Sequence, residues 1–324
     1  MSTADTSPDA RWRDPRFVLR RLTRRPTAPL ADYDRPALDD ATRARLTAAA
    51  AAARAPGGPD VAFVLGVMPR SGTNFLERLL LTHPDTEGAP GGLRELPALG
   101  AAGALEGFRD ALGRLYGPNA DLFARHEWLA YALGGYLNAA RAGCAEGTRT
   151  LLIKDPRVRN VWLFDAVTPP DTRALIVLRD GRYLVDSTIR TWPLRPLGRT
   201  FEDVCLEWEA ATRATLDYAE AAPEGRVRPV RYEDLVARGP AEMAEICGWL
   251  GLDPAGLDAA ALEGAPVLGS STHSREEGGK VGWTPVQKDA AFDPTGRALD
   301  WTAAQKATFE RICGATQARA GYDA

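Results

Sequence analysis

An α/β fold with a mostly parallel central sheet flanked by helices is predicted by three observations. Four apolar runs rich in Val, Ile and Leu begin near residues 61, 150, 173 and 226. Segments with helical periodicity separate these runs, and a Gly-containing loop follows the first of them. Near-continuous apolar runs are typical of strands covered on both faces, and their alternation with helices is typical of a parallel sheet.

The order of the segments predicts one main domain with an N-terminal extension. Residues 1–58 hold a polar arm, interrupted by prolines, and one Ala/Arg-rich helix that ends at the loop APGGPD. The first 30 residues contain seven Arg and three Asp, and we expect this basic segment to be a solvated arm or a helix packed on the domain. Residues 59–324 form the main domain, in which residues 98–149 have the spacing of a helical layer.

Composition and charge exclude several function classes. The chain has 45% hydrophobic and 26% charged residues, and its formal charge of -3 gives no electrostatic reason to expect a nucleic-acid partner. We expect no membrane span, because the apolar runs are too short. The four cysteines form no CxxC pair and the chain has three histidines, which argues against a zinc site. These features predict a cytoplasmic protein with reduced thiols.

A candidate anion site follows the first apolar run, in VLGVMPRSGTNFLERLL at residues 64–80. The apolar spacing at the end of this segment predicts an amphipathic helix over residues 74–81, and Thr73 or Ser71 can cap it. The free N–H groups of the first helical turn, together with the helix dipole, favour a bound anion. A simple glycine turn between strand and helix is the alternative.

The same loop differs from a Walker-A loop, which has the pattern GxxxxGK[ST]. Gly66 and Gly72 are six residues apart instead of five, and Thr73 follows Gly72 with no lysine between them. The cation of this loop is Arg70, whose rigid set of donors suits a tetrahedral oxyanion. The absence of the Lys-Ser/Thr pair also removes the usual magnesium anchor.

The segment PRSGTNFLERLL resembles the 5′-phosphosulfate loop of the PAPS-dependent sulfotransferase family, which usually has PRSGTT or PKSGTT. The resemblance implies a P-loop NTPase-like sulfotransferase fold. It implies that the donor is 3′-phosphoadenosine 5′-phosphosulfate (PAPS) and the product 3′-phosphoadenosine 5′-phosphate (PAP). The residues implied to hold the 5′-phosphosulfate are Arg70, Ser71, Gly72, Thr73 and Asn74. Asn74 stands where Thr is commoner, and its amide can still donate a hydrogen bond.

A second motif, ALIVLRDGRYLVDSTIRTW, places Arg179 at a strand end and Ser187 eight residues later, on the next helix. A strand end and a neighbouring helix can converge on one phosphate, with Arg supplying charge and Ser a hydroxyl. The 3′-phosphate motif of the family has the same Arg, step and Ser. The resemblance therefore implies that this pair and the loop around Gly72 hold opposite ends of one nucleotide.

Two further segments are similar to parts of the family. VRYEDLVARGP places Tyr232 where the family has a tyrosine against the adenine, and Pro240 is expected to open a helix. HSREEGGKVGWTP is loosely similar to the lid over the 3′-phosphate, which makes Arg275 and Lys280 candidates for that phosphate. A solvated polar loop is the alternative for this last segment.

The base is a separate question, because the cytosolic branch of the family uses a histidine after a Lys-Thr. The run IKDPRVR keeps Lys154 but has Pro156 in the place of that histidine. This run is more similar to the tyrosylprotein and related bacterial branches, in which a glutamate takes the proton. Glu87 and Glu95 are the candidates, and we favour Glu95 because it follows a Gly-rich loop. The resemblance implies that Lys154 neutralises the transferring sulfuryl group and Arg70 the leaving phosphate.

The predicted function is a PAPS-dependent sulfotransferase that needs no metal and acts on a hydroxyl or amine of a small molecule or peptide. We expect the helical layer at 98–149 and the loop at 86–97 to shape the acceptor pocket. One alternative is a P-loop kinase, which the missing lysine and the lack of an evident metal-binding Asp disfavour. The other is a PAP-binding protein without sulfation activity. The acceptor, the number of subunits and the choice between the two glutamates stay open at this stage.

Overall fold

A five-stranded parallel sheet forms the centre of the molecule, with strand order β2-β3-β1-β4-β5. The computed structural model describes residues 30–119, 121–191, 199–265, 273–275, 281–283 and 298–322. The strands are β1 (Asp60–Gly66), β2 (Thr86–Gly88), β3 (Thr150–Asp155), β4 (Arg173–Leu178) and β5 (Val227–Arg231). The predicted parallel α/β fold is therefore confirmed, and the four apolar runs are β1, β3, β4 and β5. The short edge strand β2 was not predicted.

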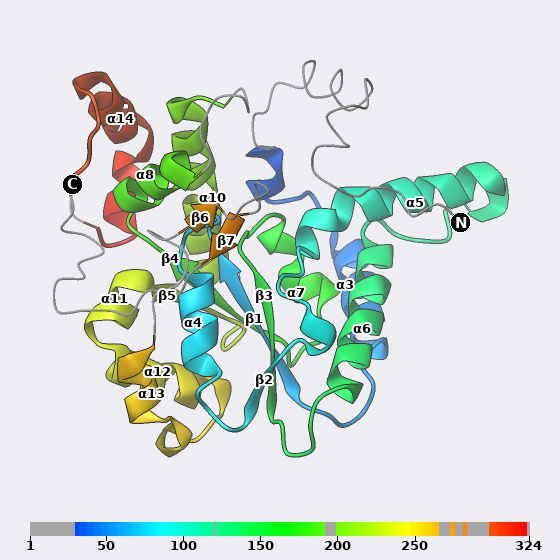
Figure 1. Ribbon diagram of the computed structural model, residues 1–324. Coiled ribbons are helices and arrows are strands. Elements are labelled where there is room, and N and C mark those ends of the chain that lie inside the picture. Colours follow the sequence, from blue (N-terminus) through cyan, green and yellow to red (C-terminus); the bar gives the residue numbers. More distant parts are fainter. Residues whose placement is uncertain are drawn as a thin grey trace, which may run out of the picture.

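Helices cover both faces of this sheet, as Figure 1 shows. Along β1 the alternate residues Val61, Phe63 and Leu65 pack into one hydrophobic core, and Ala62 and Val64 pack into the other. Helices that pack into the first core are α3 (Asp40–Ala52), α6 (Glu127–Ala142), α7 (Phe164–Val167), α8 (Gly181–Thr191), α10 (Phe201–Ala221) and α14 (Ala303–Arg319). Helices that pack into the second core are α4 (Thr73–Leu80), α11 (Tyr232–Ala237), α12 (Gly239–Leu250) and α13 (Ala259–Gly264).

The described part of the N-terminal extension, residues 30–58, contains η1 (Leu30–Tyr33) and the expected Ala/Arg-rich helix, α3. Asp39 caps α3 by accepting a hydrogen bond from the Thr42 N–H at 2.6 Å. Leu46 and Ala50 of α3 are fully buried in the first core. This helix thus packs on the sheet domain, while most of the basic segment lies outside the described residues.

The predicted helical layer consists of α5 (Ala102–Leu115) and α6, and α5 projects from the body of the molecule in Figure 1. The segment expected to form a lid contributes the antiparallel pair β6 (His273–Arg275) and β7 (Val281–Trp283). Lys280 lies outside the described residues, and the structure describes only the backbone of Arg275. The short 3-10 helices are η2 (Pro90–Gly92), η3 (Leu99–Ala101), η4 (Gly117–Asn119), η5 (Val161–Leu163) and η6 (Pro254–Gly256). Among the helices described, none combines the length and apolar character needed to cross a bilayer.

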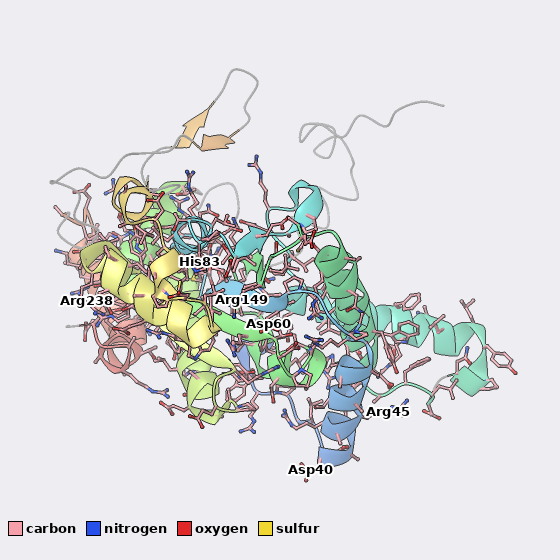
Figure 2. The ribbon with its side chains drawn as sticks, turned by 90° about the horizontal axis from the view of Figure 1, so that it is seen from below. Asp40, Arg45, Asp60, His83, Arg149 and Arg238 are labelled. Carbon is pink, nitrogen blue, oxygen red and sulfur yellow. The ribbon has the colours of Figure 1, made fainter. Side chains whose placement is uncertain are left out.

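The two ends of the parallel strands differ in what they carry. The underside of the molecule carries the amino ends, where Asp60 begins β1 and Arg149 precedes β3 (Figure 2). At the opposite end, the loops that follow β1, β3 and β4 meet. These carboxyl ends are where open α/β sheets bind ligands. Predicted site residues follow β1, β2, β4 and β5, and Lys154 lies near the end of β3.

Candidate active site

The loop between β1 and α4 ends at Gly72, which is the N-cap of α4 in the left-handed conformation, with φ 112°. No side chain caps this helix, so the expected capping by Thr73 or Ser71 is wrong. The hydroxyl of Ser71 is used inside the loop, where it donates to the Met68 carbonyl at 2.6 Å and accepts from the Met68 N–H at 3.1 Å. Hydrogen bonds within the loop therefore hold its shape, and the N-terminus of α4 has no side-chain cap.

The first turn of α4 offers an anion site. The backbone N–H groups of Gly72, Thr73 and Asn74 have no hydrogen-bond acceptor among the described residues. Such N–H groups point along the helix axis at the positive end of the helix dipole, which is the geometry that binds phosphate and sulfate in proteins. The four apolar positions of α4 that the sequence predicts to be buried are buried against the second core: Phe75, Leu76, Leu79 and Leu80.

Arg70 joins the first motif to the second. Its backbone is also left-handed, with φ 85°, a conformation that costs a non-glycine residue energy and is found most often at functional sites. Its Nε donates to the hydroxyl of Ser187 on α8 at 3.2 Å, and its carbonyl accepts from a guanidinium nitrogen of Arg179 at 2.9 Å. The two motifs that the sequence places more than 100 residues apart are therefore in direct contact.

Arg179 follows the last residue of β4 and is only 4% exposed. Within the described part of the chain it forms no ion pair with a carboxylate, and its Nε has no hydrogen-bond partner. The adjacent Asp180 is instead paired with Arg182 at 2.7 Å. A buried charge without a directly paired carboxylate is costly, and an anion bound beside this guanidinium would reduce that cost.

The ring of Tyr232 packs against both the β1–α4 loop and Arg179. It lies so close to Gly72 that a Cβ at that position would come within 2.4 Å of a ring carbon. The guanidinium of Arg179 lies over the same ring, 4.7 Å from its centre. The ring is 1% exposed in this structure. Its contact with an adenine therefore stays a prediction, whereas its packing against the loop is a structural fact.

A cavity of about 680 Å³ opens beside the loop, a volume in the range of small-molecule sites. The β1–α4 loop forms one wall. The opposite wall comes from the segment after β2 and the segment after β3, which are tied together where the Leu96 N–H donates to the Lys154 carbonyl at 2.7 Å. The lining residues are Pro69, Arg70, Thr73, Asn74, Glu95, Pro97, Gly100, Ala101, Asp155, Pro156, Arg157 and Arg159.

The two candidate glutamates lie in different places. Glu95 lines the cavity. Glu87 belongs to β2, and its carboxylate accepts hydrogen bonds from the Ala145 N–H at 2.8 Å and the Thr148 hydroxyl at 2.9 Å. That carboxylate is occupied in holding the turn before β3, and it does not line the cavity. The geometry favours Glu95 as the residue that can reach a ligand.

Lys154, near the end of β3, is 8% exposed and is not among the residues that line the cavity. Its ammonium donates to the Asn74 side-chain oxygen at 2.7 Å and to a carboxylate oxygen of Glu77 at 2.5 Å. Asn74 does line the cavity. In this structure Lys154 therefore orients Asn74, and its direct contact with a sulfuryl group stays a prediction.

Asp155 is a site residue that the sequence reasoning missed. It is 3% exposed and lines the cavity, and the only hydrogen bond to its carboxylate among the described residues comes from the Arg157 N–H at 3.0 Å. The pKa of Asp155 is raised to about 7, mainly by burial and to a smaller extent by the charge of Glu95, while Arg157 and Arg159 oppose the shift. The signal was present in DPRVR, where charged residues directly follow a buried strand.

Comparison with known proteins identifies the family of this chain. The sequence model of the sulfotransferase family matches residues 61–255, which is more than half of the chain. The chain therefore belongs to the sulfotransferase family.

Among curated relatives, the nodulation protein NoeE of Sinorhizobium fredii is 29% identical over 235 residues, which cover 65% of this chain and 54% of that protein. The chain thus spans about half the length of that relative. The sulfotransferase domain from the olefin synthase of Synechococcus PCC 7002 is 21% identical with a TM-score of 0.49, over 82% of this chain and 96% of that one. The sulfotransferase domain from the curacin biosynthetic pathway is 17% identical with a TM-score of 0.47, over 82% and 98%.

Proposed function

We propose that this chain transfers a sulfuryl group from PAPS to a hydroxyl or amine of an acceptor. Membership of the sulfotransferase family supports the class of reaction. The observation that carries the proposal is the buried, carboxylate-free Arg179, which lies against Arg70 beside the open N–H groups of α4. Two anion-binding groups in contact suit a ligand that carries two anionic groups, as PAPS does.

The residues fit this donor in named roles. Bound PAPS would supply the sulfuryl group and a phosphate as leaving group. We propose that the N–H groups of Gly72, Thr73 and Asn74, with Arg70, hold its 5′-phosphosulfate, because preorganised donors stabilise charge that develops on a leaving phosphate. Arg179 and Ser187 would hold the 3′-phosphate. The proposed roles of Arg275 and Lys280 in a lid rest on the sequence alone.

Glu95 is the proposed general base. A base must reach the acceptor proton, and Glu95 lines the cavity whereas Glu87 is bonded elsewhere. This choice supports a place in the branch of the family that uses a glutamate. Lys154 would hold Asn74 against the loop, and Arg70 would face the leaving phosphate.

One feature of the structure favours the kinase alternative, and one feature of the sequence opposes it. Asp155 ends β3 beside β1, which is where a P-loop enzyme carries its metal-binding Asp. The lysine of the phosphate loop is still absent. Thermal-shift measurements with PAP and with ATP and magnesium separate the two functions, and we expect PAP alone to raise the Tm.

The test of the proposed function is the affinity for PAP in the Arg179→Ala variant, measured by calorimetry. We expect the Kd to rise about 10²-fold, because several charge-assisted hydrogen bonds are lost. Arg190→Ala is the matched control, since Arg190 lies on α8, one turn beyond Ser187, with a 52% exposed side chain. An unchanged Kd in Arg179→Ala, or no binding of PAP to the wild-type protein, would refute the proposal.

A further inference from the structure

We propose that the acceptor carries an anionic oxygen group, such as a carboxylate or sulfonate, which Arg157 and Arg159 bind while Glu95 faces its hydroxyl or amine. This inference rests on the proposed function. It proposes a class of acceptor for the part of the cavity that is lined by residues outside the nucleotide motifs.

The sheet order separates the two halves of the site. β3 lies on one side of β1, and β4 lies on the other. Arg179 follows β4, while Arg157 and Arg159 follow β3 together with Asp155. The cavity is lined by the residues after β3 but not by Arg179. The two arginines are therefore on the side of Glu95, where the acceptor must lie if the nucleotide occupies the motifs around Arg179.

Arg157 is a half-buried cation that lines the cavity. Its guanidinium forms no ion pair and no hydrogen bond with any residue that the structure describes. Its backbone is fixed, because its N–H donates to the Asp155 carboxylate at 3.0 Å and the next residue, Val158, is fully buried. A guanidinium held in a cavity with free donors binds carboxylates and related oxyanions in a bidentate manner.

Arg159 is oriented by groups behind the cavity wall. Its Nε lies 3.9 Å from the Asp32 carboxylate, and a terminal nitrogen lies 4.0 Å from Glu207. Glu207 is 1% exposed and is bonded more closely to Arg199 at 2.5 Å and to the Tyr33 hydroxyl at 3.3 Å. These contacts set the direction of the Arg159 side chain but are long for ion pairs, and the Tyr33 hydroxyl is a further hydrogen-bond partner of that side chain. Its buried Nε has no hydrogen-bond partner in the described chain.

The charge balance of this wall supports the same conclusion. Its carboxyl groups are Glu95 and Asp155, which face two arginines. Because burial raises the pKa of Asp155 to about 7, this carboxyl is partly protonated at neutral pH. The residues that line this wall therefore have a surplus of positive charge near the proposed base, which the long contacts of Arg159 to Asp32 and Glu207 reduce in part. An uncharged acceptor would leave that surplus desolvated without compensation, whereas an anionic acceptor neutralises it.

The test measures binding to the PAP-loaded protein with two matched pairs of probes. The first pair is 4-hydroxyphenylacetate and 4-hydroxyphenylacetamide, and the second is 4-hydroxybenzenesulfonate and 4-hydroxybenzenesulfonamide. Each pair differs in charge while the phenol is kept. We expect the wild-type protein to bind the anion of at least one pair about tenfold more tightly by calorimetry. Arg157→Gln and Arg159→Gln should each reduce that preference at least threefold.

Arg94→Gln is the control, because Arg94 is an exposed arginine next to Glu95 that does not line the cavity, and it should keep the preference. Equal affinity for the charged and neutral probes in the wild-type protein would overturn the inference while PAP binding leaves the proposed function standing. A preference that survives both arginine substitutions would overturn it as well. With labelled PAPS, an equal fall of kcat for charged and neutral acceptors in Arg157→Gln would assign this residue to the sulfuryl group instead.

Discussion

The two sides of the candidate site are built in opposite ways. On the nucleotide side, Arg70 and Ser187 belong to strand–loop–helix units whose residues are close in sequence, and these units dock through a few short contacts. On the acceptor side, the wall joins residues 95–101 to residues 155–159, which are held together by the Leu96 N–H and the Lys154 carbonyl. The difference teaches that the side to which we assign the nucleotide is built from units that are local in sequence, while the side to which we assign the acceptor is assembled by the fold.

The largest effect is expected for a substitution on the acceptor wall, and it should change turnover without changing nucleotide binding. Replacing Glu95 by Gln removes the proposed base, so we expect kcat to fall about 10²- to 10⁴-fold while the Kd for PAP changes less than threefold. Turnover is measured with labelled PAPS and the acceptor probes. Glu87→Gln is the control, because Glu87 contacts the turn before β3 and not the cavity. Full turnover in Glu95→Gln would remove Glu95 from the mechanism and reopen the choice of base.

A change on the nucleotide wall should instead act on binding and stability. In Gly72→Ala, the new Cβ would lie 2.4 Å from the buried ring of Tyr232, at a φ of 112° that disfavours any side chain. We expect the free energy of unfolding to fall by about 3 kcal/mol and the affinity for PAP to fall at least tenfold, because the ring or the loop must move. Urea unfolding and calorimetry measure the two effects.

Gly91→Ala provides the comparison in the segment that follows β2, outside the residues that line the cavity. Gly91 has a similar left-handed φ of 75°, but a Cβ at this position would have no atom within 4 Å. Its substitution should therefore cost only about 1 kcal/mol, the intrinsic cost of a left-handed alanine, and leave the Kd for PAP unchanged. Equal losses at the two glycines would mean that the contact between Gly72 and Tyr232 is unimportant.

The same contrast explains how much the sequence could predict. Four of the five strands and the buried face of α4 follow from apolar periodicity, which is a local property. The edge strand β2 has three residues, too few for a periodic signal, and it forms through its pairing with β3. The cap of α4 was mispredicted because the hydroxyl of Ser71 is bonded to Met68 inside the loop, a detail of loop closure that residue preferences do not contain.

Charge environments were the least predictable feature. Asp155 and Lys154 are neighbours on one strand, yet burial leaves Asp155 with a single backbone donor, while Lys154 reaches across to Asn74 and Glu77 on α4. The environment of Lys154 depends on how α4 packs over β3, and that of Asp155 depends on the segments that hold Glu95, Arg157 and Arg159. The sequence shows the charged residues after the strand, but only the fold shows which of them is compensated.

The smallest effect on nucleotide binding is expected for Asp155→Asn. This variant tests the charge state of Asp155 through the pH dependence of the free energy of unfolding. Asp155 has a pKa of about 7 in the folded protein, above its ordinary value of 3.8. The folded state therefore binds more protons than the unfolded state between these two values, and the contribution of Asp155 to stability decreases as the pH rises through that window. Asp155→Asn removes this contribution. Relative to the wild-type protein, the variant should gain about 2 kcal/mol between pH 5 and pH 8.

Urea unfolding at several pH values measures that difference, and the slope matters more than the absolute stability, because an amide also changes the hydrogen bonding at this site. Glu95→Gln serves as a second probe, since the charge of Glu95 contributes to the raised pKa of Asp155. In that background, Asp155→Asn should produce a smaller gain between the same pH values, because the two sites are coupled. Parallel pH profiles for the wild-type protein and Asp155→Asn would show that this carboxyl ionises normally. In that case the acceptor wall would hold two full negative charges at neutral pH, and the positive surplus attributed to Arg157 and Arg159 would vanish.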